Sequence, residues 1–162
     1  MRLWHQDLIS VLPDKQLLAQ WRELNSIYKK KDKHILINFI YQYSNLDLLI
    51  YSQLVIQEML KRNFKIKSLN NYYKYFEKES PEIVEDLQMP WKIEGDYVFK
   101  KHFDNIYLII CCYNLYEKAI RGQKGFDKSK LEFLFKCIAT HKFNYFQLLN
   151  KYKELEGDKL IC

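Results

Sequence analysis

The chain has 162 residues, of which 48% are hydrophobic and 28% charged, and this balance predicts one ordered globular domain rather than a disordered chain. It contains only four glycines and three prolines, which favours helices over a turn-rich β fold. Its 26 Lys and Arg residues against 20 Asp and Glu give a net charge of +6, which suits a polyanionic partner but is equally typical of a protein kept soluble by charge.

The four cysteines do not have the spacing of a metal centre. Cys111, Cys112, Cys137 and Cys162 form no Cys-x-x-Cys pair and no cluster with histidine. No apolar stretch reaches the length of a membrane span, and polar residues at positions 5–7 interrupt the place where a signal peptide would begin. We therefore expect a cytoplasmic, reduced protein without metal, cofactor or membrane attachment.

The chain begins with a segment, residues 1–12, that we expect to be an irregular or extended arm. Pro13 followed by Asp14 then marks the start of a helix. Its apolar residues recur at helical spacing and predict a buried stripe made of Leu17, Trp21, Leu24 and Tyr28. Arg22 and Glu23 lie off that stripe. The carboxylate of Glu23 would therefore face either the solvent or a cleft that the arm closes.

A basic run, residues 29–34, follows this helix and is either a solvated face or a set of phosphate contacts. A further helical segment is expected over roughly 35–42. Ser44 then has the character of an N-cap for a helix that extends to about Lys61. This helix ends in a second basic group, formed by Lys61, Arg62, Lys65 and Lys67.

Residues 68–101 are less regular in pattern, and helices return in the last third of the chain. We expect helices from about Asp104 to Arg121, from Asp127 to about Thr140, and over roughly 143–155. The fold class is therefore all-α, as a single compact domain over residues 1–162 with five to six helices and an irregular N-terminal arm.

The first 24 residues combine an α-amino group with a helical carboxylate, and this pair can carry chemistry. An α-amine has a pKa of about 7.7–8.0, well below that of a lysine, so part of it is neutral at pH 7. A neutral amine can attack carbon and form a Schiff base, and a nearby carboxylate can move the protons. Met1 and Glu23 are thus candidates for catalysis, although an ordinary terminus beside an ordinary helix fits these residues too.

The residues resemble one known family. Its motifs are matched by Asp14–Leu24, by Lys33-His34, by Leu60–Lys67 and by Gly95-Asp96-Tyr97, which together look like the pyrimidine-dimer DNA glycosylase family of phage endonuclease V. The opening residues, 1–8, are similar to a bacterial branch of that family. The resemblance is close over residues 1–67 and loose over 94–121, so residues 1–121 resemble the glycosylase and 122–162 are extra C-terminal helices.

The resemblance implies a small helical enzyme that binds damaged duplex DNA as a monomer, kinks it at a pyrimidine dimer and flips a base out. Its N-terminal amine displaces the base from the sugar and a helix glutamate assists strand cleavage, which gives glycosylase and abasic-site lyase activity. On this chain the catalytic residues would be Met1 and Glu23. The implied DNA-binding residues are Arg2, Arg22, Lys33, His34, Lys61, Arg62 and Lys65.

The chain also departs from the family pattern. Arg2 is a large second residue that would keep the initiator methionine in place, so the reactive amine would be that of Met1. Gln16, Ser26 and Asn114 stand where the family has basic residues. These changes leave two alternatives open: a non-catalytic helical DNA-binding protein, and a helical interaction protein that shares only the fold.

Overall fold

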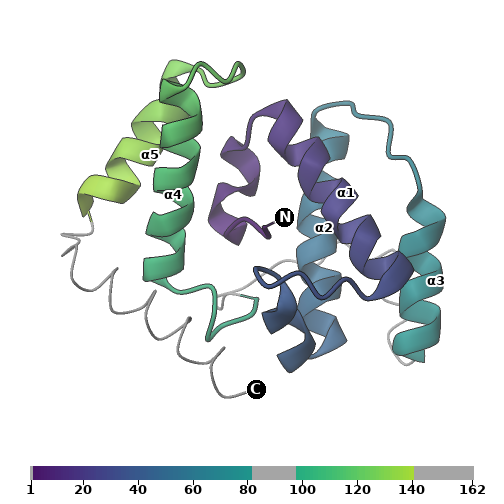
Figure 1. Cartoon of the computed structure of the whole chain (residues 1–162). Helices are drawn as coiled ribbons and strands as arrows, with labels where there is room; N and C mark the ends of the chain where they lie inside the picture. The colour runs from purple at the N-terminus through teal and green to yellow at the C-terminus, as the bar shows by residue number, and fades with distance from the viewer. Residues whose placement is uncertain (1, 82–97, 141–162) are drawn as a thin grey trace.

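The computed structural model describes residues 2–81 and 98–140 (Figure 1). All regular structure in these residues is helical, which confirms the all-α prediction. The elements in chain order are the 3-10 helix η1 (Gln6–Val11), α1 (Asp14–Lys30), the 3-10 helix η2 (Asn38–Gln42), α2 (Asn45–Lys61), α3 (Leu69–Glu79), α4 (Asn105–Ile120) and α5 (Lys128–Thr140).

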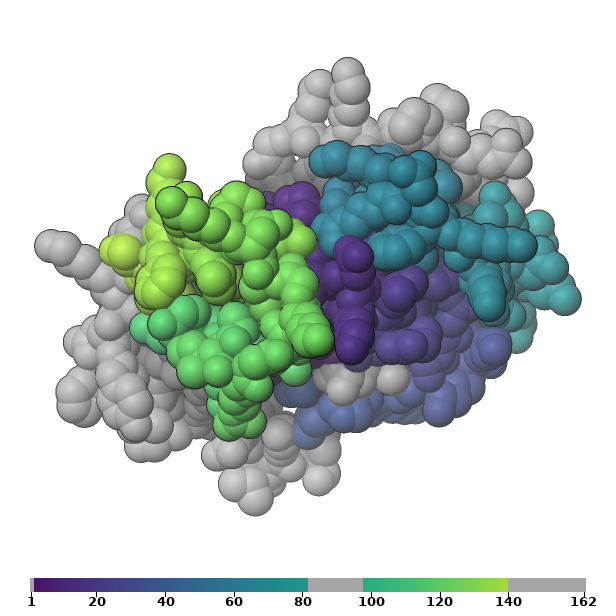
Figure 2. Space-filling model, turned by 90° about the horizontal axis from the view of Figure 1, so that it is seen from above, coloured from purple at the N-terminus to yellow at the C-terminus, as the bar shows by residue number. Residues whose placement is uncertain are grey.

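The helices form two groups with the beginning of the chain between them. Helices α1, α2 and α3 pack together, α4 and α5 form an antiparallel pair, and η1 contacts both α2 and α4 (Figure 1). Seen from above, the purple N-terminal residues lie between the green of α4 and α5 and the teal of the segment before α3 (Figure 2). One hydrophobic core runs through the described residues, from Leu3 to Leu134.

Helix α1 begins where the sequence predicts and continues to Lys30, into the basic run. Pro13 precedes its first residue, Asp14 lies in the first turn, and Lys31 ends it in the left-handed conformation with φ 48°. The predicted stripe is buried in full, with exposed fractions between 0% for Leu17 and 8% for Tyr28. The helix therefore has one fixed face, and this determines where Arg22 and Glu23 point.

The irregular N-terminal arm was a wrong prediction. Residues 6–11 form η1, and Leu3, Leu8 and Leu12 are completely buried in the core. Since η1 is only six residues long, its apolar residues show no full helical period in the sequence. The segment is thus an internal layer of the protein rather than a flexible extension.

The helix α3 was not predicted either, because we expected residues 68–101 to be less regular. Tyr72, Tyr75 and Phe76 are its buried face, at i, i+3 and i+4. The helix expected over 35–42 is the shorter η2, whereas the predicted Ser44 cap and the boundaries of α2, α4 and α5 are confirmed within a residue or two. The helix predicted over 143–155 lies outside the described residues, as does Cys162.

Two smaller expectations concern the apolar helices. Cys111 and Cys112 are fully buried in α4, as predicted. Among the helices that the structure describes, none is both long and apolar enough to cross a membrane.

Candidate active site

Glu23 is joined directly to the beginning of the chain. Its Oε2 atom accepts a hydrogen bond from the backbone amide of Arg2 at 3.2 Å and another from Nε2 of Gln20 at 3.3 Å. Figure 1 shows the start of the chain in the middle of the molecule, between α1 and α4. The fold therefore brings together the predicted carboxylate and the N-terminal segment, while Met1 itself lies outside the described residues.

A buried polar network holds this segment in place. Gln20 is completely buried and its Oε1 accepts from the backbone amide of Trp4 at 2.9 Å and from the Tyr51 hydroxyl at 3.1 Å. The same hydroxyl lies 2.7 Å from the carbonyl oxygen of Trp4. On the opposite side, the Tyr107 hydroxyl donates to the carbonyl of Leu3 at 2.6 Å. Helices α1, α2 and α4 thus each fix one point of the chain beside Glu23.

These supporting residues are hard to recognise in the sequence. Gln20 precedes Glu23 by three positions and so shares its helix face, which was a usable signal. Tyr51 and Tyr107 are distant in the chain, and only the packing of α2 and α4 brings their hydroxyls to the N-terminal backbone.

The surroundings of Glu23 suit a group that exchanges protons. Partial burial raises the pKa of its carboxyl above the usual range, because low-dielectric surroundings disfavour the charged form. The hydrogen bond from the Arg2 amide and the positive charges of Arg22 and Arg2 act in the opposite direction on this pKa. A carboxyl with a raised pKa is a better proton acceptor and donor near neutral pH.

Arg2 brings a positive charge to the same place. Its guanidinium carbon lies 5.9 Å from the centre of the Trp4 ring, within the range of a cation–π interaction. Its Nη1 atom is buried and has no hydrogen-bond partner among the described residues. Arg2 as a whole is half-buried, and its positive charge acts on the Glu23 carboxylate.

A basic groove of about 480 Å³ lies on the adjoining face of α1. We use this name for the surface lined by Trp21, Arg22, Asn25, Ser26, Lys29, Lys30, Lys67 and Ser68. The indole nitrogen of Trp21 donates to the carbonyl of Lys67 at 2.8 Å and so fixes one wall against the other. Arg22 is exposed here, and the lysines from two segments make the groove a candidate phosphate-binding surface.

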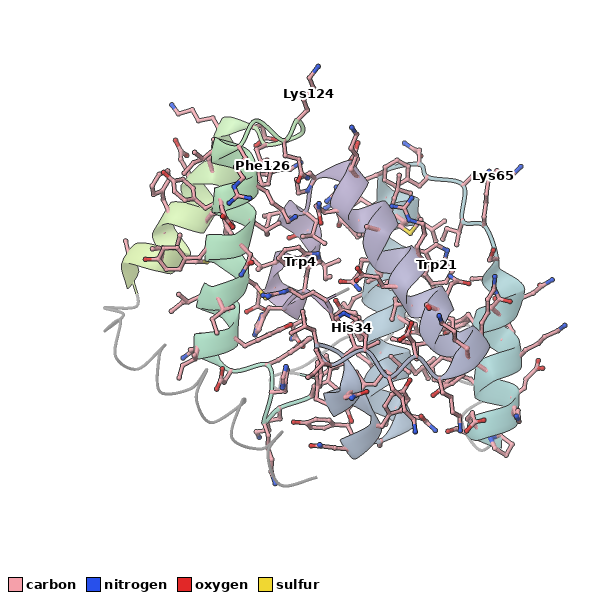
Figure 3. All side chains as sticks on the ribbon, viewed as in Figure 1. Trp4, Trp21, His34, Lys65, Lys124 and Phe126 are labelled. Carbon is pink, nitrogen blue, oxygen red and sulfur yellow. The ribbon has the colours of Figure 1, made fainter. Side chains whose placement is uncertain are left out.

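The other predicted contact residues lie in two separate segments, after α1 and at the end of α2. Lys33 and His34 are exposed on the loop after α1, and Lys61 and Lys65 are exposed at the end of α2 and beyond it. His34 and Lys65 are labelled in Figure 3 on these two separate segments. None of these four residues lines the basic groove.

Comparison with known proteins gives one match. A family model described as pyrimidine dimer DNA glycosylase matches residues 1–71. Residues 1–71 are therefore similar to the pyrimidine dimer DNA glycosylase family. This segment includes Glu23, its supporting Gln20 and the whole basic groove. The comparisons with curated proteins and with solved structures gave no match.

The matched segment ends at residue 71. It does not reach α4, although Tyr107 of α4 holds the N-terminal backbone. The loose resemblance over 94–121 and the bacterial branch both stay predictions. So does the single domain over residues 1–162, because residues 82–97 and 141–162 are not described.

One predicted DNA-binding residue of the matched segment, Arg62, has an internal role. The Arg62 side chain is only 16% exposed and forms a 2.7 Å ion pair from Nε to Glu58. Its Nη1 donates to the carbonyl of Leu12 at 2.6 Å and its Nη2 to that of Ser10 at 2.8 Å. Because these bonds engage all three nitrogens, Arg62 joins α2 to the end of the N-terminal segment, and we do not include it among the proposed DNA contacts.

Within residues 2–81 and 98–140, His, Cys, Asp and Glu side chains form no group of three or more that could hold a metal ion.

Proposed function

We propose that this protein is a DNA-repair glycosylase with abasic-site lyase activity, which acts on damaged duplex DNA through the α-amino group of Met1. The observation that carries the proposal is the 3.2 Å hydrogen bond between the Arg2 amide and the Glu23 carboxylate. It lies within the segment that matches the family.

This bond limits how far the reactive amine can be from Glu23. The α-nitrogen of a residue is two carbons away from the next amide nitrogen, so covalent geometry alone holds the amine within about 7 Å of Oε2 in any conformation of the first residue. One deoxyribose ring can bridge that separation. The amine and the carboxylate can therefore act on the same sugar.

In the proposed reaction the α-amine is the nucleophile and Glu23 is the base. The neutral α-amine attacks C1′ of the damaged nucleotide, the glycosidic bond breaks, and its electron pair leaves with the base, which takes up a proton. Opening of the sugar ring gives a Schiff base between C1′ and the amine. Glu23 then takes a proton from C2′, and the 3′ phosphate leaves by β-elimination, which cuts the strand.

The basic groove would bind the DNA backbone next to this centre. Arg22, Lys29 and Lys67 line it with exposed cations, and such cations supply affinity and orientation rather than sequence preference. A base can react only outside the stack, so the enzyme must also distort the duplex.

A non-catalytic DNA-binding protein is the second candidate, and two side chains favour it. Ser26 and Asn114 stand where the family pattern has basic residues, and both make internal hydrogen bonds. The Ser26 hydroxyl donates to Asp32 at 2.8 Å, and the Asn114 amide donates to the carbonyl of Ile110 at 2.6 Å. These positions support the fold here and add no positive charge.

Borohydride trapping distinguishes the two candidates, since borohydride reduces a Schiff base to a stable adduct. The wild-type protein should form a covalent adduct with duplex DNA that contains an abasic site. N-terminal acetylation should abolish the adduct, and Glu23→Gln should keep the adduct but lose the strand cut, whereas Glu132→Gln, at an exposed glutamate of α5, should change neither. Salt-dependent DNA binding without any adduct would favour the non-catalytic protein.

A further inference from the structure

Two exposed aliphatic side chains occupy the tip of a tight turn just after the basic groove. The amide of Ile37 donates to the carbonyl of His34 at 2.8 Å, so Ile35 and Leu36 are the central residues of a four-residue turn, which we call the apolar turn. They are 51% and 44% exposed. Central turn positions usually hold Gly, Pro, Asn or Asp, whereas this turn leaves about half of two aliphatic side chains in contact with water.

The apolar turn is held in a defined shape from both sides. Within it, the Leu36 amide donates to Nδ1 of His34 at 3.2 Å. Before it, Asp32 accepts from the His34 amide at 3.1 Å, and the Tyr41 hydroxyl donates to the Asp32 carbonyl at 2.7 Å. After it, Ile37 is completely buried. The tip is therefore preorganised, which lowers the entropic cost of inserting it into a partner.

Charge identifies the kind of partner. The preceding residues include Lys29 and Lys30 of the basic groove and the exposed Lys33. Helix α1 continues directly from the groove into this loop, which crosses the molecule below Trp21 in the view of Figure 3. An apolar tip preceded by cations and continuous with the basic groove fits a duplex whose backbone lies in the groove.

We infer that Ile35 and Leu36 form a wedge that enters the base stack of bound DNA and kinks it. Apolar side chains inserted between base steps unstack them and bend the helix, at a cost that backbone contacts offset. The wedge rests on the proposed function for its role, since opening the stack would help to expose the damaged nucleotide. Ile35 and Leu36 would thus position the DNA and take no part in the reaction itself.

The test compares two double variants that remove similar amounts of apolar surface. Ile35→Ser with Leu36→Ser removes the wedge, and Leu60→Ser with Ile120→Ser removes two other exposed aliphatics, 58% and 67% exposed. Energy transfer between dyes at the two ends of a bound duplex reports its bend without any reaction. The wild type and the control should bend the duplex, and the wedge variant should bind it with the same salt dependence but leave it straight.

The trapping rate is a second readout. The wedge variant should trap abasic duplex DNA at least about tenfold more slowly than the wild type and trap an abasic single strand at the same rate, because a single strand has no stack to open. Equal bending and equal duplex rates would overturn the wedge, as would an equal reduction on both substrates. A wild type that bends DNA but traps none would contradict the proposed function alone.

A lipid surface is the other partner that an apolar tip with cations could suit. Flotation with vesicles that contain anionic phospholipid separates the two cases. If the wild type floats, the wedge variant does not, and both bend DNA equally, the wedge assignment is wrong.

Discussion

Arg22 and Glu23 are neighbours in the sequence but belong to two regions of opposite character. Glu23 faces inward to the N-terminal segment, where its carboxylate is partly buried and accepts two hydrogen bonds. Arg22 lines the open basic groove. A helix rotates by about 100° per residue, so a single step along α1 separates a region suited to chemistry from one suited to holding a charged polymer. Changes in one region should therefore leave the function of the other intact.

The largest effect is expected at Glu23. Glu23→Gln should slow strand cleavage at an abasic site by about 10²- to 10⁴-fold, the usual contribution of a general acid or base, because Glu23 takes the C2′ proton. Its amide oxygen can still accept the bonds from Arg2 and Gln20, so DNA affinity should stay unchanged. Fluorescence anisotropy with the same duplex measures this affinity. A decrease in affinity would show that Glu23 also contributes to DNA binding and that the two regions are not separate.

Arg62 tests the contact that joins α2 to the end of the N-terminal segment. Arg62→Met should lower the free energy of unfolding by about 2–4 kcal/mol, because it leaves Glu58 with only the 3.9 Å pair to Lys61 and leaves two backbone carbonyls without a donor. Lys61→Met, at a neighbour that is 76% exposed, should change it by less than about 0.5 kcal/mol. Urea denaturation compares them, and equal stabilities would contradict the internal role of Arg62.

Tyr51 tests the network that holds the N-terminal segment. Tyr51→Phe should cost about 1–3 kcal/mol of unfolding free energy, since the buried Gln20 and the Trp4 carbonyl lose a donor. It should also reduce the trapping rate without weakening DNA binding. Tyr113→Phe, at a tyrosine that is 46% exposed, is the control, and an unchanged trapping rate for Tyr51→Phe would show that this network does not position the amine.

Substitutions in the basic groove should weaken DNA binding and leave the reaction rate unchanged. Lys29→Ala with Lys67→Ala should weaken DNA binding and reduce the slope of log affinity against log salt by about 1 for each phosphate that the protein no longer neutralises. At saturating DNA the trapping rate should be that of the wild type. Lys128→Ala, on an α5 side chain that is 91% exposed, is the matched control, and a slope that does not change would remove the groove from the DNA interface.

The smallest effect is a pH dependence of stability. Because burial raises the pKa of Glu23 in the folded state, the wild type loses stability as pH rises from the unfolded value of about 4.3 through the higher folded value. Glu23→Gln does not titrate, so relative to the wild type it should gain about 1 kcal/mol or less between pH 4 and pH 7. Urea midpoints at the two pH values measure this, and a relative decrease for the variant would mean that the pKa shift has the opposite sign.

The features that the sequence predicted depend on long local patterns, and those that it did not predict depend on distant contacts. The stripe of α1 and the cap of α2 follow from spacing and from Ser44. The role of η1 could not be predicted, because six residues are too few to show a helical period. Helix α3 was missed because its buried residues lie within a run of aromatic residues. In the site, Glu23 was a candidate from the chemistry of the first 24 residues and from the family resemblance, whereas Tyr51, Tyr107 and the internal bonds of Arg62 required the packing of several helices.

The most direct test of the account is to locate the covalent adduct. Wild-type protein is trapped on an abasic duplex with borohydride, digested and sequenced by mass spectrometry. We expect the added mass on the α-nitrogen of Met1, with the methionine retained before Arg2. An adduct on a lysine of the basic groove would contradict the central claim, because the chemistry would then lie in the region assigned to binding.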